Sequence, residues 1–586
     1  MLSRARRDPG LALVAVAVLA VIGLYGTTLT RGLVNYDDYA LLRDNYLVQH
    51  PSLAALHTVV FDLAAHRGFS QAPEYLPVRD ASVMLDVAVW GRWYGGFHLT
   101  NLLLYIAAIL VWFRALERFG IERSVAGLAL LLWALHPTHA ESVAWLSERK
   151  GLLAVLFVGT SALGYATFRA GGAPRWLALA VVAAVLAVWS KATAAFGIAA
   201  LAGLEVALPA ARVSWRRSLG GLAVIAVVAG IAFIPVLQIA ASADVVGTRV
   251  HAPISRFHLV TGVLGFYIRL GAMLVPNAIS YPLATDGAGV GDVVLGIIAL
   301  TAFGLAFVPR VGAPPALRAA CALWLIAWIP ISHLVLPLQM VVVADRYMLV
   351  PTLGIALAAA VGLRAIANPR YRGLLIGTVV VAAGLRTLDA ASNWSDSVTL
   401  WERAVRSNPT DPEACSSYAL ALIDIGHSEA AIPIVDGCLE RSRSPRLVLR
   451  KALLLVAQQK RAEGIALLRT IADTDPRAMA DLAVLLDKEG AKAEGLEASR
   501  KVVISAPAYA HGHRIHGKLA RAAGADAEAL AAFERAYALD PRDPANEYNL
   551  ALGLLSMHRR AEAYGHLVAC SLDPVYGQAC RGTLAK

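Results

Sequence analysis

Long apolar runs separated by short polar connectors fill the chain up to about residue 392, and they constrain its fold more than any other feature. A helix of about twenty apolar residues can cross the hydrocarbon core of a bilayer with its backbone polar groups bonded internally. The pattern predicts an all-α membrane domain over residues 1–392 with about eleven transmembrane helices. The expected spans are residues 11–28, 99–116, 124–141, 151–168, 176–190, 192–210, 218–240, 290–308, 319–337, 347–365 and 373–391.

Composition changes after residue 392. Of all 586 residues, 58% are hydrophobic and 16% are charged, whereas soluble proteins usually carry about 25% charged residues. Residues 393–586 are charged and rich in alanine, so a soluble second domain is expected there. The net charge of +11 could indicate a nucleic-acid partner. However, the basic residues of the first domain gather in connectors, as the positive-inside rule predicts, and we therefore expect no nucleic-acid binding.

The connectors also predict the topology. Arg4, Arg6 and Arg7 precede the first apolar run, which we interpret as an uncleaved span with its N-terminus in the cytoplasm. The polar segment before the second span predicts short helices along the outer membrane surface. Residues 241–289 are ambiguous because prolines interrupt their apolar part, and a surface or re-entrant segment is preferred. An odd number of spans then places residues 393–586 outside the cytoplasm. The composition favours a bacterial inner membrane and a periplasmic second domain.

The second domain carries a weak internal repeat. Its clearest unit, AEALAAFERAYALDPRDPANEYNLALGLL, matches the tetratricopeptide pattern of two helices with small contact residues and a closing proline. Stacked units form an α-solenoid whose concave face commonly binds polypeptide. Prolines recur at intervals of 31 to 36 residues, at Pro409, Pro445, Pro476, Pro507, Pro541 and Pro574.

Four of the five cysteines fall in the second domain. In an oxidising compartment, Cys415 with Cys438 and Cys570 with Cys580 could form disulfides. Spacing alone fixes no connectivity, so small buried thiols are an equal alternative.

Two polar stretches at the ends of apolar runs are the candidates for a site. Residues 136–151 read HPTHAESVAWLSERKG, and the second stretch contains Asp37 and Asp38. Charge this dense at a membrane boundary is costly and indicates function. An adjacent carboxylate pair supplies a general base or a ligand for a divalent cation, although a helix N-cap is the alternative. We expect the two stretches to face each other on the outer side.

Within residues 136–151, His136, His139 and Glu141 have a spacing that could bind zinc. Pro137 interrupts the helix that such a ligand set needs. Histidines that contact a phosphate or orient a carboxylate are therefore preferred, and the metal, if any, stays undetermined.

Several cations fall on the outer side, where the positive-inside rule disfavours them. Arg149, Lys150 and Lys191 are suited to binding phosphate and to stabilising a leaving phosphate. Interaction of Lys150 with lipid headgroups is the alternative. The remaining charged residues of this side are supporting candidates: Glu148, Asp345 and Arg346. The adjacent residues Asp345 and Arg346 also fit a structural ion pair.

Five motifs carry a family resemblance over nearly the whole chain. They are VNYDDYALLRDNYLV, FHLTNLLLY, HPTHAESVAWLSERKGLLAVLF, ADRYMLVPTLG and WSDSVTLWERAVRSNP, in this order. With them the chain resembles the membrane O-mannosyltransferase-like family with tetratricopeptide repeats, a branch of the glycosyltransferase C superfamily. Two positions depart from that family, which usually has Asp at Gly151 and often Glu or Pro at Ala192.

The resemblance implies an integral membrane enzyme that transfers a sugar, expected to be mannose, from a polyprenyl phosphate to Ser or Thr hydroxyls of proteins. The transfer would occur on the extracytoplasmic face with inversion. Asp37 or Asp38 would be the base, and Arg149, Lys150 and Lys191 would contact the donor phosphate. Gly151 removes a carboxylate from that site. A non-catalytic membrane scaffold and a glycosyltransferase for lipid or polysaccharide acceptors therefore remain the alternatives.

Overall fold

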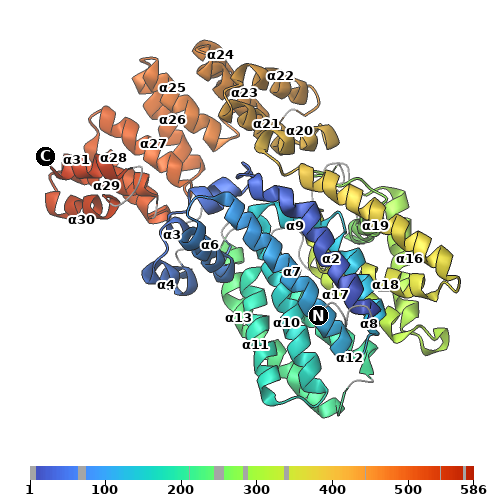
Figure 1. Ribbon diagram of the computed structural model, residues 1–586. Helices are drawn as coiled ribbons and strands as arrows, with labels where there is room; N and C mark the ends of the chain where they lie inside the picture. Colours follow the sequence, from blue (N-terminus) through green and yellow to red (C-terminus); the bar gives the residue numbers. More distant parts are fainter. Residues whose placement is uncertain are drawn as a thin grey trace. The chain divides into compact units, whose positions relative to one another are not determined.

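The computed structural model describes residues 8–63, 74–209, 212–242, 256–281, 288–334, 342–442, 444–541, 543–571 and 576–585, and every regular element in them is a helix (Figure 1). Several sequence predictions reach beyond these residues: the leading arginines, parts of residues 241–289, the last residues of two spans, and Pro574.

The chain divides into two compact units. The first extends to Asn408, and the second begins at Pro409. The sequence-predicted boundary after residue 392 coincides with the end of helix α19 (Pro369–Ser392), whereas helix α20 (Ser397–Ser407) is part of the first unit.

Within the described part of the first unit, five helical segments are long and apolar enough to cross a membrane. They are Pro9–Thr30, formed by α2 (Pro9–Tyr25) and η1 (Gly26–Thr30); α7 (Tyr94–Arg118); Leu146–Arg169, formed by η3 (Leu146–Glu148) and α10 (Arg149–Arg169); α13 (Trp215–Ser242); and α19.

Further apolar helices of the first unit are shorter, at 10 to 17 residues. Length and composition therefore support fewer spans than the sequence predicted, and the count of eleven stays a prediction. These helices are α8 (Arg123–Ala134), α11 (Pro174–Ser190), α12 (Ala194–Ala207), α16 (Val290–Ala306), α17 (Pro315–Trp328) with η6 (Ile329–Ile331), and α18 (Pro351–Ala365).

Small residues allow close helix packing in the first unit, as is common between membrane helices. A Cβ added to Gly159 on α10 would lie 2.8 Å from the indole nitrogen of Trp112 on α7. That nitrogen donates a hydrogen bond to the carbonyl of Val155, at 3.0 Å. A larger residue at position 159 would therefore separate α7 from α10, the helix that begins in the polar stretch.

The segment between the first two long helices forms short helices, as predicted. They are α3 (Tyr46–Gln49), α4 (Leu53–Phe61) and α6 (Pro77–Trp90), with the π-helical turn η2 (Tyr39–Arg43) before them. Helix α14 (Arg256–Gly271) falls in the ambiguous region and packs against α16. The carbonyl of its last residue, Gly271, lies 2.9 Å from the His136 ring. Helix α14 thus ends beside the connector that carries the histidines.

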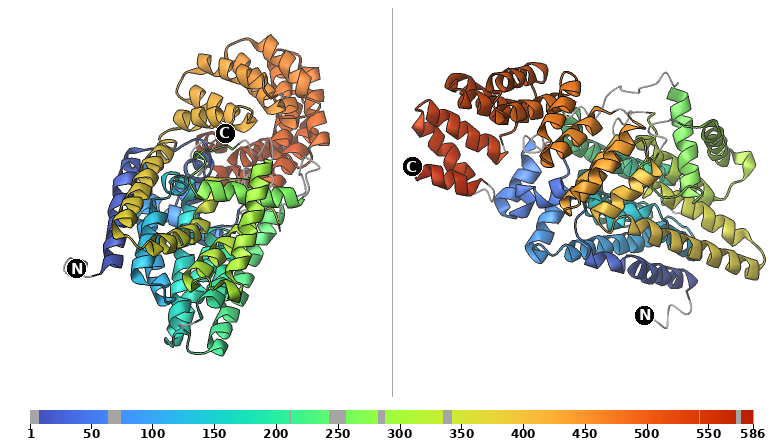
Figure 2. Two further views of the ribbon diagram at one scale, coloured as in Figure 1. Left: turned by 90° about the vertical axis from the view of Figure 1, so that its right-hand side faces the viewer. Right: turned by 90° about the horizontal axis from the view of Figure 1, so that it is seen from above.

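The second unit consists of successive antiparallel helix pairs (Figure 2). Asp411, Asp475 and Asp543 cap the first helix of three pairs, each followed by proline at the first helical position. Prolines thus also open first helices, not only close second helices as expected. The helices are α21 (Pro412–Asp424), α22 (Ser428–Leu439), α23 (Pro445–Ala457), α24 (Arg461–Ile471), α25 (Pro476–Lys488), α26 (Lys492–Ser505), α27 (Ala510–Ala522), α28 (Asp526–Leu539), α29 (Pro544–Ser556), α30 (Arg560–Cys570) and α31 (Gly577–Leu584).

Both expected cysteine pairs are disulfides in the structure. Cys415 and Cys438 join the two helices of the pair α21–α22, and Cys570 and Cys580 join α30 to α31. The remaining cysteine, Cys321, is a buried thiol on α17.

Candidate functional site

Polar connectors from distant parts of the first unit meet around residues 136–151. Ser147 binds Asp38 of the first connector, Glu148 pairs with Lys191 between α11 and α12, and Glu141 pairs with Arg346 before α18. The two polar stretches singled out in the sequence are thus in contact. The short helix α9 (His139–Ala144) and the turn η3 carry the residues that make these contacts.

Asp38 is fully engaged by the protein. Its carboxylate accepts hydrogen bonds from the Ser147 hydroxyl at 2.5 Å, the Ser147 backbone N–H at 3.0 Å and the Val34 backbone N–H at 3.1 Å. The residue is 1% exposed. Burial raises the pKa of Asp38 to about 6, although these hydrogen bonds oppose the shift. Asp38 therefore fastens the first connector to residues 146–148.

Asp37 has the opposite surroundings. It is partly exposed, and no described residue donates a hydrogen bond to its carboxylate. Lys150, Arg346 and Arg79 act on it electrostatically. Burial raises the pKa of Asp37, and the field of Lys150 counters this shift most. Both carboxylate oxygens of Asp37 are therefore available to a substrate or a cation.

Lys150 is held beside Asp37 by a carboxylate that the sequence analysis did not single out. The Lys150 ammonium lies 2.9 Å from both oxygens of Glu74, which also pairs with Arg79 at 2.8 Å. Burial alone would raise the pKa of Glu74, but Lys150 and Arg79 outweigh it and lower the pKa to about 2. Glu74 follows residues that are not described, and no motif in the sequence marks it.

Arg149 is turned away from this group. Its side chain is 1% exposed and pairs with Asp86 at 2.5 Å. It also donates to Asn101 at 2.8 Å and to the Phe97 carbonyl at 2.9 Å. These contacts join α10 to α6 and α7. Arg149 therefore binds residues of the helix core and not the charged group around Asp37, although it directly follows Glu148 in the sequence.

Both histidines are buried and bonded within the protein. His136 lies 2.8 Å from the Thr138 hydroxyl and 2.9 Å from the Gly271 carbonyl. Because a carbonyl only accepts, Nε2 of His136 carries the proton. His139 lies 2.7 Å from both the Tyr105 and the Thr352 hydroxyls. The His136 ring thus joins the turn at Thr138 to the end of α14.

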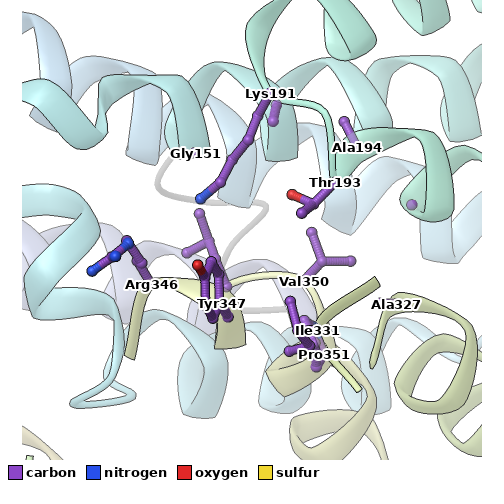
Figure 3. Close-up of a pocket in the computed structure, with 13 residues that line it drawn as sticks. Gly151, Lys191, Thr193, Ala194, Ala327, Ile331, Arg346, Tyr347, Val350 and Pro351 are labelled. Carbon is purple, nitrogen blue, oxygen red and sulfur yellow. The ribbon is translucent and has the colours of Figure 1, made fainter. Parts of the chain in front are cut away.

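A small cavity opens next to the charged connectors, with about 430 Å³ of unfilled space, part of it open to solvent. Its polar lining comes from Lys191, Arg346, Tyr347 and Thr193, and apolar residues such as Val350 line the remainder. Figure 3 shows the Lys191 side chain extending toward Tyr347 from the connector before α12, with Arg346 to the side. Two cations thus border one cavity.

Each cation of the cavity is paired with a buried glutamate. Lys191 pairs with one oxygen of Glu148, whose other oxygen has no partner among the described residues. Arg346 binds Glu141 through its guanidinium at 2.5 Å and its backbone N–H at 2.8 Å. The glutamates hold the cations at the cavity wall and compensate their charge.

Gly151 also lines this cavity. A Cβ at position 151 would lie 2.6 Å from an oxygen of Glu148. The carboxylate of Glu148 thus lies directly over the position where a side chain of residue 151 would begin. The absence of a carboxylate at residue 151 does not leave this part of the site without one.

Asp345 directly precedes Arg346 in the sequence but binds different partners. It accepts hydrogen bonds from the Tyr281 hydroxyl at 2.5 Å and from the Asn277 amide at 2.7 Å. Burial, assisted by the nearby Glu141, raises the pKa of Asp345 to about 8. Asp345 and Arg346 therefore do not pair with each other, unlike the structural alternative considered for this dipeptide.

No group of three or more His, Cys, Asp or Glu side chains in the described residues could hold a metal ion. His136 and His139 use both ring nitrogens in hydrogen bonds, and Glu141 binds Arg346. The described side chains of this stretch therefore do not form a three-ligand zinc site.

Aromatic residues flank the first connector, and the sequence analysis did not assign them a role in the site. The Tyr36 ring stacks on Trp145 at 4.8 Å, and Trp145 stacks on Trp394 at 5.1 Å. Trp401 meets Tyr36 edge-on at 5.2 Å. The motif WSDSVTLWERAV contains Trp394 and Trp401 and was the sequence signal that could have revealed them. Its position in the chain suggested only a linker.

Comparison with known proteins gives distant similarities. No protein-family model matches the chain, and no curated protein matches it in sequence. An oligosaccharyltransferase of Archaeoglobus fulgidus, solved with a tethered acceptor peptide, aligns over 70% of this chain and 59% of its own, at 14% identity and a TM-score of 0.38. The TPR protein YrrB aligns over 31% of this chain and 97% of its own, at 17% identity and a TM-score of 0.25. MamA from Desulfovibrio magneticus RS-1 aligns over 27% and 92%, at 15% identity and a TM-score of 0.24. At these values the similarities assign neither a family nor an activity.

Proposed function

We propose that the chain is a membrane glycosyltransferase of the glycosyltransferase C type, with about eleven spans, that transfers a sugar from a polyprenyl phosphate to protein hydroxyls outside the cytoplasm. One observation carries the proposal. The Asp37 carboxylate, without a hydrogen-bond donor among the described residues, lies in the field of Lys150 and Arg346, and the latter borders the cavity. An available base beside cations is what displacement of a phosphate by a hydroxyl requires.

Asp37 is the general base of this proposal, and Asp38 holds its connector in place. A base must reach the acceptor proton, and a carboxylate already saturated by protein donors is a poor acceptor. Asp38 receives three hydrogen bonds, whereas Asp37 receives none from the described residues. This assignment resolves the choice between the two neighbours in favour of Asp37.

The donor phosphate is assigned to the cavity, with Lys191 and Arg346 as its contacts and Lys150 nearby. The lining supports this assignment because cations and the Tyr347 and Thr193 hydroxyls occur together with apolar residues. A lipid phosphate needs both, since its head is anionic and its chain is apolar. Arg149 is not a phosphate contact in this proposal because its guanidinium is buried and bonded to Asp86.

The reaction follows from these positions. Asp37 accepts the proton of a Ser or Thr hydroxyl, whose oxygen forms a bond to the anomeric carbon of the sugar. The bond between that carbon and the phosphate oxygen breaks, and its electron pair leaves with the lipid phosphate. Lys191 and Arg346 stabilise the charge that develops there. Attack opposite the leaving group inverts the anomeric configuration. A divalent cation, if required, would bind at the oxygens of Asp37 and the phosphate.

Two features support the extracytoplasmic orientation of the site and of the repeats. Basic side chains gather at the helix ends remote from the site, where Arg123 pairs with Asp8 and Arg364 with Glu122. The positive-inside rule assigns such ends to the cytoplasm. The disulfides of the second unit are typical of proteins in an oxidising compartment such as the periplasm. The repeats would bind the protein acceptor.

The test is a transfer assay with purified full-length protein, synthetic polyprenyl-phosphate mannose and solubilised membrane proteins, with and without EDTA. We expect sugar on Ser or Thr residues, and the EDTA arm reports any metal requirement. Parallel reactions with polyprenyl-phosphate glucose and galactose determine the sugar. Transfer only to lipid or polysaccharide would replace the proposed acceptor. No transfer from any donor by folded protein would favour a membrane scaffold.

A further inference from the structure

Helix α20 binds the first connector two residues before Asp37. The backbone N–H of Asn35 donates a hydrogen bond to the Ser397 hydroxyl at 2.9 Å. The Asn35 side-chain oxygen accepts one from the indole N–H of Trp401 at 2.5 Å. Asn35 is therefore held through both its backbone and its side chain by one turn of α20.

The next residue, Tyr36, is held by rings. It stacks on Trp145 with an interplanar angle of 14°, and Trp401 meets its edge at 80°. Trp394, just before α20, stacks on the Trp145 ring at 16°. As whole residues, Trp145, Trp394 and Trp401 are 2–3% exposed. Water therefore does not separate these rings, and Tyr36 has little freedom.

The residue after Asp37, Asp38, is held by two hydrogen bonds from Ser147. Residues 35, 36 and 38 are thus fixed by protein contacts, whereas the Asp37 carboxylate has no bond to a described donor. This combination is unusual for a loop whose contacts serve stability alone, because such a loop gains from pairing its buried charges. It fits a loop that presents one carboxylate in a set position.

Resting on the function proposed above, we infer that α20 is a positioning element of the active site: Ser397 and Trp401 bind Asn35, and Trp394 supports Tyr36 through Trp145, so that Asp37 faces the acceptor hydroxyl. Ser397, Trp401 and Trp394 do not line the cavity to which the donor phosphate is assigned. The motif WSDSVTLW therefore positions the first connector, in addition to connecting the first unit to the repeats. Displacement of a base by about 1 Å reduces turnover by as much as about 100-fold.

The experiment measures transfer by full-length variants at saturating polyprenyl-phosphate mannose and a saturating Ser/Thr peptide. We expect Trp401→Phe, which keeps a ring but loses the indole donor, to lower kcat about tenfold. The KM for the donor should change less than about twofold, because the cavity is untouched. Asn35→Ala should lower kcat similarly, and the double variant should be no slower than the slower single variant, because both remove the same bond.

Two matched variants separate positioning from general packing. Ser397→Thr keeps a hydroxyl acceptor for Asn35 and should retain activity, whereas Ser397→Ala should lower kcat. Trp215→Phe changes a tryptophan that is 58% exposed on α13, and it should leave kcat unchanged. A loss of folded protein at constant kcat in Trp401→Phe and Asn35→Ala would show a role in stability alone and overturn the inference.

The pH profile supplies a readout that packing would not move. Glu74, Arg79, Lys150 and Arg346 face Asp37. Because burial raises the pKa of Asp37, a loosened connector that admits water should shift the acid limb of kcat to lower pH. An unshifted acid limb together with wild-type kcat in Trp401→Phe contradicts positioning. Full activity of Asp37→Asn would instead refute the proposed base, so the two failures are distinguishable.

Discussion

The buried charges around Glu205 and those around Asp37, both in the described part of the first unit, differ in how their carboxylates are used. In the cluster of Glu205, remote from the cavity, the carboxylate binds Arg169 at 2.6 Å, Tyr165 at 2.7 Å and Arg212 at 3.2 Å. Both oxygens of Glu205 are therefore paired. In the cluster around Asp37, cations approach a carboxylate that has no donor among the described residues.

The difference shows that buried charge by itself does not mark an active site. Arg169 is less exposed than Lys150 or Lys191, yet its ion pair with Glu205 joins two helices, α10 and α12. What distinguishes the Asp37 cluster is an available carboxylate and a cavity bordered by Lys191 and Arg346. Substrate can replace missing protein partners only where there is space.

The strongest contrast should come from neutralising one carboxylate in each cluster. Asp37→Asn should reduce sugar transfer by about 10³-fold, within the range for loss of a general base, at unchanged thermal stability. Glu205→Gln should leave kcat within about threefold of wild type because no reacting group is near it. Rates and melting temperatures of both purified variants provide the measurement. Equal loss of transfer in the two variants would contradict the comparison.

The cations of the cavity should show the next largest effect. Arg346→Ala and Lys191→Ala should each lower kcat about 100-fold, because stabilisation of the leaving phosphate is lost. Arg346→Lys should recover part of the rate, and Lys191→Arg likewise. Arg212→Ala, which removes a cation near Glu205, is the matched control and should keep normal turnover. Steady-state kinetics with the same donor decide between these outcomes.

Thermal stability should depend more on Glu205 than on Asp37, which is the reverse of the expected effect on sugar transfer. Glu205→Ala leaves Arg169 buried without its carboxylate, and loss of one partner of a buried pair costs about 3–5 kcal/mol. We expect a lower melting temperature in detergent, with transfer retained at low temperature. Asp37→Ala should not lower the melting temperature, since that carboxylate forms no hydrogen bond with described residues. A destabilised Asp37→Ala protein would argue that Asp37 has a structural partner.

The last expected effect is on stability between about pH 4 and 8. Burial raises the pKa of Asp345 from 3.8 to about 8 in the folded protein, so above pH 5 the folded state binds a proton that the unfolded state has released. Stability from this group is therefore complete below pH 4 and is lost as pH rises through 8. The melting temperature should fall over this window, and Asp345→Asn should flatten the decline. An unchanged slope in Asp345→Asn would show that another group titrates.

Much of the fold was readable from the sequence because helix formation is local. Apolar runs predicted helices such as α7 and α10, and the proline spacing predicted the helix pairs of the second unit. The count of eleven spans did not follow from helix length, because helices such as α8 and α12 are too short to be assigned by composition alone. The polar stretch 136–151 and the pair Asp37–Asp38 were also found from residue types.

The sequence by itself determined which stretches are apolar, which are repeated and which concentrate charge. The tertiary structure decided how individual charges are used. Asp37 and Asp38 are neighbours of the same type, yet Ser147, 109 residues away, takes up Asp38. Arg149 turns to Asp86, and Lys150 turns to Glu74. Which donor and acceptor atoms of a side chain stay unpaired depends on the distant groups that reach it, and local sequence does not encode that geometry.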